Sequence, residues 1–532
     1  MTALRLSGID FSYGPRRLFR FGKLTLNDGE RVGLIGINGS GKSTLLDIIA
    51  GISEPSAGSV EAYMPVSYFR QGRTGLQSPT PESLSAFSAE PGLENPSGGE
   101  LTRLKLASAF APAGGIILLD EPTTNLDLDG IMTLREAISD WDGPVIMVTH
   151  DAALMAETCS RIWKLKDCGI VDFPGGYEEW AEFEKHMEES AGRRYEEYLR
   201  KRRHLLRAMS ESMASSKSLR KAPSRMGNSE ARLHKRQAAE SSEKLAMRAN
   251  AIKTRLEKLE RVERPRPDKE LAMAFSRPRK DLPRFLAALR DLHLSAGMKP
   301  LLQGASLDLP SGMKTCLMGP NGCGKSTLVG KLADPASGYL PRGIKVGLLR
   351  QDLSSLDDSG TAVENCTRDT GATEQAARTV LARLRIRRDM ALVAVGAMSG
   401  GERMKVALAR IMLSDCDVML LDEPSNHMDI ESVEALSEVL SAWPGTLLMA
   451  SHDRALIDAV ADRLIIFEGM SLRSYEGNWS DYESSRLYAP DLEALAESMR
   501  RAEDAYKDAS GRGVKPSSEA SSEETVGVGP TS

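Results

Sequence analysis

Short apolar runs and helical patterns alternate in two separate parts of the chain. In the first part, apolar residues dominate positions 32–35, 116–119 and 145–148, and the second part repeats this order at 316–318, 418–421 and 447–450. Such short runs, bounded by glycine, proline or polar residues, predict buried strands, and their alternation with helical segments predicts parallel α/β sheets. Because the order occurs twice, we expect a duplicated α/β domain.

The middle of the chain, roughly 178–269, has a different pattern. Apolar residues recur there at helical spacings in two stretches, which contain Tyr195, Tyr198, Leu205 and Leu206, and Leu245, Ile252, Leu256 and Leu259. A Ser-rich segment broken by Pro223 and Gly227 separates the two stretches. We therefore predict an αα-hairpin with helices of roughly 35 residues, each about 50 Å long.

These patterns predict four parts. We expect an α/β domain with a short helical subdomain at 1–178, a basic helical-hairpin linker at 179–270 and a second α/β domain at 271–485. The C-terminal extension, 486–532, is expected to be partly helical and then disordered, because its end is rich in Ser and Glu.

A glycine-rich nonapeptide follows the first apolar run of each half. It reads GINGSGKST at 36–44 and GPNGCGKST at 319–327, and both fit G-x-x-x-x-G-K-[ST]. In this pattern backbone N–H groups close around phosphates, the lysine reaches the β/γ-phosphates and the next hydroxyl ligates Mg²⁺. The sequence thus predicts two nucleoside-triphosphate sites. Their candidate residues are Gly36, Asn38, Gly39, Gly41, Lys42, Ser43 and Thr44, and Gly319, Asn321, Gly322, Gly324, Lys325, Ser326 and Thr327.

Four further elements follow each loop in the same order. They are Gln71, Ser97-Gly98-Gly99, Asp120-Glu121 and His150 in the first half, and Gln351, Ser399-Gly400-Gly401, Asp422-Glu423 and His452 in the second. An aspartate that ends an apolar strand can hold Mg²⁺ through its hydration shell, and the next glutamate can polarise the attacking water. The glutamine can complete the metal or water network, the histidine can contact the γ-phosphate, and SGGE offers N–H groups at a helix start.

The elements therefore have separate expected roles. The predicted catalytic residues are Glu121, Glu423, His150 and His452. The predicted Mg²⁺ ligands, partly through water, are Ser43, Gln71, Asp120, Ser326, Gln351 and Asp422.

Charge is distributed unevenly along the chain. The formal net charge is −5, yet residues 193–258 contain 19 Lys/Arg and 7 Asp/Glu, a net charge of +12. This asymmetry predicts that the middle of the chain meets a polyanion. The alternative is a solvated, salt-bridged helical spacer, although a spacer has no need of net positive charge.

Cysteine usage and hydropathy exclude several classes of protein. The six cysteines form no CxxC pair, which predicts a reduced, cytoplasmic setting with no zinc or iron–sulfur site. No apolar run approaches roughly 18 residues, and the first residues lack the blocks of a secretory signal, so we expect no membrane span.

The order of motifs resembles the ATP-binding cassette (ABC) superfamily, in which SGGE lies between the phosphate loop and LLDEP. The implied fold is two nucleotide-binding domains, each with a P-loop NTPase core and a helical subdomain. In that family two cassettes pair head to tail, and each ATP lies between the phosphate loop of one and the SGGE of the other. The resemblance implies a monomer whose cassettes pair internally. One site combines Lys42, Asp120 and Glu121 with Ser399 and Gly401, and the other combines Lys325, Asp422 and Glu423 with Ser97 and Gly99.

The resemblance also gives Tyr13, in DFSYG, the role of stacking on adenine. The aligned segment of the second half is HLSAG, which offers Ala296 at that place, so the second site departs from the family pattern.

Fused cassettes, a long basic helical linker and no membrane span together resemble the ABC-F group, soluble ATPases that act on ribosomes. Asn426-His427-Met428-Asp429, the looser Thr124-Asn125-Leu126-Asp127 and the linker sequence at 223–236 add to this likeness. The resemblance implies that the linker meets large-subunit ribosomal RNA. Its tip, around 215–228, would approach peptidyl-site transfer RNA and the peptidyl-transferase centre.

The region before the first SGGE is short. Only 25 residues separate Gln71 from Ser97, against 47 between Gln351 and Ser399. Housekeeping members often carry an extra helical arm in this region, so the shortening resembles the antibiotic-resistance branch. We therefore expect ribosomal protection.

Three other functions remain open. The chain could be a general ABC-F translation factor. A fused importer ATPase would need a full helical subdomain in each cassette and would lack a long basic hairpin. A DNA-repair cassette ATPase would usually carry zinc modules or very long coiled coils.

Overall fold

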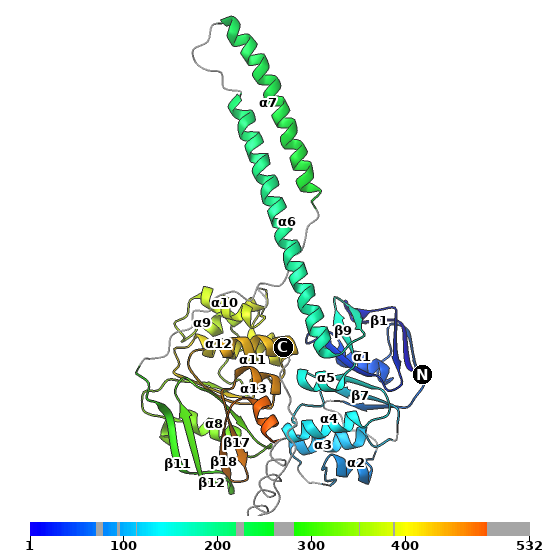
Figure 1. Cartoon of the computed structure of the whole chain (residues 1–532), viewed down its shortest axis with the longest axis vertical. Helices are drawn as coiled ribbons and strands as arrows, with labels where there is room; N and C mark the ends of the chain where they lie inside the picture. The colour runs from blue at the N-terminus through cyan, green and yellow to red at the C-terminus, as the bar shows by residue number, and fades with distance from the viewer. Residues whose placement is uncertain are drawn as a thin grey trace, which may run out of the picture.

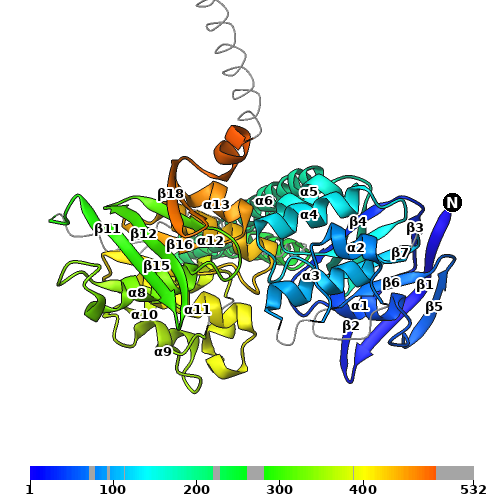
Figure 2. The same cartoon turned by 90° about the horizontal axis from the view of Figure 1, so that it is seen from below.

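The computed structural model describes residues 1–70, 78–92, 96–112, 114–219, 228–259, 281–350, 352–386 and 389–486. Two α/β cassettes lie side by side, and a two-helix hairpin projects from the junction between them (Figure 1). The cassettes remain side by side when the molecule is seen from below (Figure 2). Within the described residues, no helix combines the length and the apolar character that crossing a membrane requires.

The first cassette is built on a six-stranded sheet in the order β10-β9-β4-β8-β7-β6, in which β10 is antiparallel to β9 and the other neighbours are parallel. The strands are β4 (Arg31–Gly36), β6 (Val66–Phe69), β7 (Ile116–Asp120), β8 (Val145–Val148), β9 (Arg161–Lys166) and β10 (Gly169–Phe173). Every residue of β7 and β8 is buried, which is why these strands read as continuous apolar runs.

An antiparallel sheet and, among the described residues, five helices complete this cassette. The sheet pairs β1 (Thr2–Tyr13) with β2 (Arg16–Arg20), β3 (Lys23–Asn27) and β5 (Ala57–Ala62). The helices are α1 (Lys42–Ile49), α2 (Pro81–Ala86), α3 (Gly98–Ala109), α4 (Leu128–Ser139) and α5 (Ala152–Thr158).

The second cassette repeats this topology. Its six-stranded sheet has the order β14-β15-β16-β13-β17-β18, which matches β6-β7-β8-β4-β9-β10 strand for strand. The strands are β13 (Lys314–Met318), β14 (Val346–Leu349), β15 (Val418–Asp422), β16 (Thr446–Ala450), β17 (Arg463–Glu468) and β18 (Ser471–Glu476). A hairpin of β11 (Phe285–Ala296) and β12 (Lys299–Pro310) forms the additional sheet. The duplication predicted from the apolar runs is therefore present.

The helical part of the second cassette is the larger one. Its α-helices are α8 (Lys325–Ala333), α9 (Ala362–Thr367), α10 (Glu374–Arg383), α11 (Gly400–Leu413), α12 (Ile430–Ala442) and α13 (Arg454–Val460). Short 3₁₀ turns lie at η1 (Pro335–Ser337), η2 (Met390–Leu392) and η3 (Val395–Ala397). In the described part of the corresponding region before α3, the first cassette has α2 alone.

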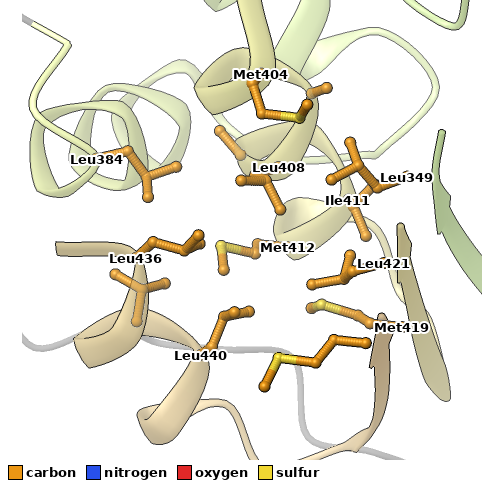
Figure 3. Close-up of a cluster of buried hydrophobic side chains, with 14 of the residues drawn as sticks. Leu349, Leu384, Met404, Leu408, Ile411, Met412, Met419, Leu421, Leu436 and Leu440 are labelled. Atoms are coloured by element: carbon orange, nitrogen blue, oxygen red, sulfur yellow. The ribbon is translucent and has the colours of Figure 1, made fainter. Parts of the chain in front are cut away.

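The core of the second cassette shows why α11 is a helix. Met404, Leu408 and Met412 follow one another at four-residue steps and are all buried. They lie on one face of α11 between α12 and β15, where Leu436 and Leu421 meet them (Figure 3). The apolar stripe thus fixes the helix against the sheet. This packing holds the first residues of α11, the SGGE segment, in place.

The linker is a helical hairpin, as predicted. It consists of α6 (Tyr177–Leu219, 43 residues) and α7 (Asn228–Glu257, 30 residues), so the two helices differ in length. The lower part of α6 belongs to the first cassette, because Trp180 is buried in its core. The domain boundaries expected at 178, 270 and 485 stay predictions. Residues 220–227, 260–280 and 487–532, which include most of the predicted tip and the C-terminal extension, lie outside the described residues.

Candidate functional site

The two phosphate loops have the same local structure, each joining a buried strand to a helix. Gly41 and Gly324 precede α1 and α8 with φ of 102° and 115°, a conformation that glycine adopts without strain. A methyl group at Gly41 would also lie 2.9 Å from the Phe19 ring. The loop glycines Gly39 and Gly322 have positive φ as well. The glycine pattern is therefore a backbone requirement of the turn.

The lysine that follows each loop is folded back over it. The Lys42 Nζ donates to the Gly36 carbonyl at 2.8 Å, and the Lys325 Nζ donates to the Gly319 carbonyl at the same distance. Burial lowers the pKa of Lys42 in spite of the nearby carboxylates of Glu121 and Asp120. The buried ammonium groups are thus held at the centre of a loop of backbone amides, where phosphate oxygens would neutralise them.

A hydroxyl and a carboxylate meet at the end of a buried strand in each half. The Ser43 Oγ donates to Asp120 at 3.1 Å, and the Ser326 Oγ donates to Asp422 at 3.0 Å. Burial raises the pKa of Asp120 to about 6 and also raises the pKa of Asp422. Each pair offers a hydroxyl oxygen and a buried carboxylate, and Mg²⁺ prefers oxygen ligands. A bound Mg²⁺ would also stabilise the charged form of the carboxylate. Gln71 and Gln351 lie outside the described residues.

The next residue in each half is a glutamate in strained backbone. Glu121 and Glu423 have φ of 54° and 50°, which is uncommon for a residue other than glycine. Such backbone strain costs free energy and persists only where the surrounding structure maintains it. It is typical of functional positions. Burial, with the Asp422 charge, raises the pKa of Glu423 to about 8.

A histidine faces each glutamate, but the two contacts differ. The His150 Nε2 lies 2.8 Å from the Glu121 Oε1, whereas the His452 Nε2 lies 3.6 Å from the Glu423 Oε1. Burial lowers the pKa of His452 to about 3, and neither of its ring nitrogens has a hydrogen-bond partner among the described residues. A buried imidazole without a partner is costly, so this ring is suited to a polar group of a ligand.

The SGGE segments begin α3 and α11 as capping boxes. The Glu100 backbone N–H donates to the Ser97 Oγ at 3.3 Å, and the Ser97 N–H donates to the Glu100 carboxylate at 2.7 Å. Ser399 and Glu402 form the same pair at the start of α11. The motif thus ends in a helix N-terminus whose remaining N–H groups are available to an anion.

Each phosphate loop lies against the SGGE segment of the other cassette. The Asn321 side chain donates to the Asn125 carbonyl at 2.6 Å, and its Nδ2 lies 3.0 Å from the position of a methyl group at Gly99. The Asn38 side chain donates to the His427 carbonyl at 3.0 Å. Its Nδ2 would lie 3.7 Å from a methyl group at Gly401.

The structure therefore brings the predicted site residues together across the two halves. The loop of Lys42 faces the helix that starts at Ser399, and the loop of Lys325 faces the helix that starts at Ser97. Asn125 and His427 make these contacts from left-handed backbone, with φ of 65° and 62°. Neither residue was predicted from the sequence to take part in the site.

Other candidate residues lie at the edge of the site. Tyr13 ends β1 with an exposed ring that meets Phe11 edge-on at 5.1 Å. Ala296 ends β11 at the corresponding place and is also exposed. Thr44 and Thr327 lie on the first turns of α1 and α8 and are half-buried.

A charged contact that the sequence did not predict joins the segments after the two histidines. The buried Arg454, at the start of α13, donates to Glu157 at 3.0 Å and lies 3.7 Å from Asp151. Burial and the Asp151 carboxylate raise the pKa of the facing Asp453 to about 6. The sequence contains one signal for this contact, which is a difference between the halves. Arg454 follows His452-Asp453, whereas Ala152 follows His150-Asp151.

Comparison with known proteins agrees with this geometry. The family model described as ABC transporter matches residues 22–78 and 302–426. The Bacillus subtilis ribosome protection protein VmlR is 26% identical over 507 residues, covering 93% of this chain and 92% of that protein. The Staphylococcus epidermidis erythromycin resistance ATP-binding protein MsrA is 28% identical, covering 89% and 96%. The Arabidopsis thaliana ABC transporter F family member 5 is 26% identical, covering 94% and 80%.

Solved structures resemble most of the chain in fold. The archaeal ribosome recycling factor aABCE1, solved in complex with the stalk protein aP1, has a TM-score of 0.59 at 22% identity and covers 88% of this chain and 89% of its own. RNase-L Inhibitor has a TM-score of 0.59 at 21% identity and covers 91% and 93%. The chain thus contains two ATP-binding cassettes, the type of domain that hydrolyses ATP with Mg²⁺, and it is similar to ABC-F proteins over most of its length.

Proposed function

We propose that this chain is a cytoplasmic, monomeric ribosome-binding ATPase of the antibiotic-resistance type. ATP binding closes the two cassettes and favours the ribosome-bound form, and hydrolysis reopens them and releases the protein. The observation that carries the proposal is the basic helical hairpin, which extends far beyond the cassettes (Figure 1). The names of two relatives support it, since VmlR is a ribosome protection protein and MsrA an erythromycin resistance protein.

The hairpin has the reach and the charge for a large RNA particle. At about 1.5 Å per residue, the 43 residues of α6 extend about 65 Å. Its exposed basic side chains include Arg193, Arg194, Arg200, Lys201, Arg202, Arg203 and Arg207. Phosphates of large-subunit ribosomal RNA are the proposed partners of these groups. The tip, around 215–228, would then act near peptidyl-site transfer RNA and the peptidyl-transferase centre.

The proposed roles of the site residues follow from their positions. Lys42 and Lys325 bind the β/γ-phosphates, and the N–H groups after Ser399 and Ser97 bind the same nucleotide from the opposite cassette. Ser43 with Asp120, and Ser326 with Asp422, hold Mg²⁺, which neutralises phosphate charge when bound. Glu121 and Glu423 accept a proton from water, and His150 and His452 face the γ-phosphate. Tyr13 stacks on the adenine of the first site, and Gln71 and Gln351 complete the metal networks.

Removing positive charge from α6 should weaken ribosome binding in a salt-dependent manner. In a variant with glutamine at Arg200, Lys201, Arg202 and Arg203, the slope of log Kd against log salt should decrease by about 1 for each lost phosphate contact. Titration of ribosomes at several salt concentrations measures this slope.

The matched control retains charge at the same four positions, with Arg200→Lys, Lys201→Arg, Arg202→Lys and Arg203→Lys. This control should keep the salt dependence of the wild type, because the number of ion contacts is unchanged. An unchanged slope in the glutamine variant would exclude these four side chains as phosphate contacts.

In vitro translation tests the function itself. Translation is measured with a panel of peptidyl-transferase and exit-tunnel inhibitors, with and without the protein. We expect the wild type to restore translation in the presence of at least one class of inhibitor. Restoration of none would favour the alternative of a general ABC-F translation factor, whereas co-purification with membrane proteins rather than RNA would favour an importer ATPase.

A further inference from the structure

A buried lysine occupies a strand position at which the duplicate has an apolar residue. Lys164 pairs with Ile35 on β4, and its side chain is 5% exposed. The equivalent residue in the second cassette is Ile466, which pairs with Met318 on β13. A buried ammonium destabilises the fold unless it is paired, so Lys164 requires partners that Ile466 does not.

The partners of Lys164 come from two other parts of the protein. Its Nζ forms a short ion pair with Glu184 on α6 and lies 3.3 Å from the Glu431 Oε1 on α12 of the second cassette. The same ammonium lies 5.4 Å from the centre of the Trp180 ring, also on α6. One charge thus joins the first cassette, the base of the linker and the second cassette.

Glu431 is itself fixed within the second cassette. Its other carboxylate oxygen accepts from Arg385 at 2.6 Å, and Arg385 follows α10 with a φ of 62°. Glu431 is the second residue of α12, directly after the Asn426–Asp429 segment that faces the first phosphate loop. The contact of Asn38 with the His427 carbonyl therefore lies only four residues before Glu431 in the chain.

We propose that Lys164 is a positioning residue that couples closure of the cassettes to the orientation of the linker hairpin. In the closed arrangement its charge is shared between Glu431 and Glu184. When the cassettes separate, Glu431 moves away with the second cassette, and Lys164 keeps Glu184 and Trp180 as partners. The electrostatic forces on the base of α6 then change, and the orientation of the hairpin changes with them.

The length of α6 amplifies a small change at its base. Trp180 stacks edge-on against Phe173 at 5.4 Å, so the first turns of α6 pack on the sheet of the first cassette. A tilt of about 5° there would move the far end of a helix about 65 Å long by about 6 Å. The proposal rests on ATP-driven closing of the cassettes, but it does not depend on ribosome binding.

Two fluorophore pairs in the full chain separate closing from tilting. Labels at Glu136 on α4 and Ala442 on α12 report the distance between the cassettes, and labels at Glu136 and Glu197 on α6 report the tilt of the linker. All three positions are exposed. Energy transfer is measured without nucleotide and with ATP, in a background in which Glu121 and Glu423 are both glutamine.

Both pairs should respond to ATP when Lys164 is present. In Lys164→Met, the response of the 136–442 pair should remain and that of the 136–197 pair should be lost. Glu431→Gln should give the same result while leaving Lys164 paired with Glu184. This second variant tests the coupling even if Lys164→Met misfolds. Lys166→Met is the matched control, because this exposed lysine ends the same strand, and it should retain both responses.

Three outcomes would overturn the proposal. A normal 136–197 response in both Lys164→Met and Glu431→Gln would exclude the coupling and leave closing intact. Loss of the 136–442 response in both would make Lys164 an ordinary interface residue. If ATP does not change the 136–442 pair even with Lys164 present, the closing step of the proposed function fails, and the coupling fails with it.

Discussion

Replacing Glu121 and Glu423 together by glutamine should lower ATP turnover by about 10²- to 10⁴-fold, the range that general-base catalysis contributes. Each glutamate directly follows the aspartate at the end of a buried strand, and its strained backbone aims it at the histidine loop. Glutamine retains the shape of the side chain but cannot accept a proton from water. The affinity for the nucleotide should therefore be retained. Steady-state kinetics measures the turnover, and equilibrium ATP binding measures the affinity.

The matched control for this variant uses glutamates outside the site. Glu136 and Glu438 occupy equivalent exposed positions on α4 and α12, and their double replacement by glutamine should leave turnover close to that of the wild type. If Glu121→Gln with Glu423→Gln retained most of its turnover, neither glutamate would be the base. The proposed chemistry of both sites would then be wrong.

A methyl group at Gly401 should inactivate the site of Lys42, although these residues belong to different cassettes. The added carbon would lie 2.3 Å from the His427 carbonyl oxygen, so the segment that contacts Asn38 has to shift. Misplacement of about 1 Å in a composite site costs about 10²-fold in rate. In a Glu423→Gln background, where the Lys325 site is silenced, Gly401→Ala should therefore lower the remaining turnover by about 10²-fold.

The same substitution, Gly401→Ala, in a Glu121→Gln background tests which of the two sites Gly401 completes. With Glu121→Gln the remaining turnover belongs to the Lys325 site, which we propose is completed by Ser97 and Gly99, so Gly401→Ala should change it little. Gly400→Ala is the matched control, because a methyl group there has its nearest neighbour at 3.9 Å. If Gly401→Ala instead inactivated the site of Lys325 alone, each cassette would complete its own site and the composite arrangement would be incorrect.

Local sequence patterns predicted the central buried strands of both cassettes and the two linker helices. The apolar run 116–119 became β7 because a strand buried on both faces requires continuous apolar residues. Ser97 and Glu100, three residues apart, form a capping box for the same kind of local reason. Such features depend on neighbours within one turn or one strand, so the sequence contains their full signal.

Contacts between the cassettes could not be derived in the same way. Asn38 and His427 meet across 389 residues of sequence, and their contact exists only once both cassettes are folded and docked. His427 adopts a left-handed backbone conformation, but a histidine in the sequence does not indicate this conformation as a glycine would. The role of Lys164 likewise depends on the folded chain, which brings Glu184 and Glu431 to it as partners.

In the proposed function, ATP-closed cassettes favour the ribosome-bound form of the protein. Co-sedimentation with ribosomes at low salt tests it most directly, using the variant with glutamine at both Glu121 and Glu423. We predict that this variant pellets with ribosomes in ATP and stays in the supernatant in ADP. A variant that binds ATP but remains free of ribosomes at low salt would contradict the account.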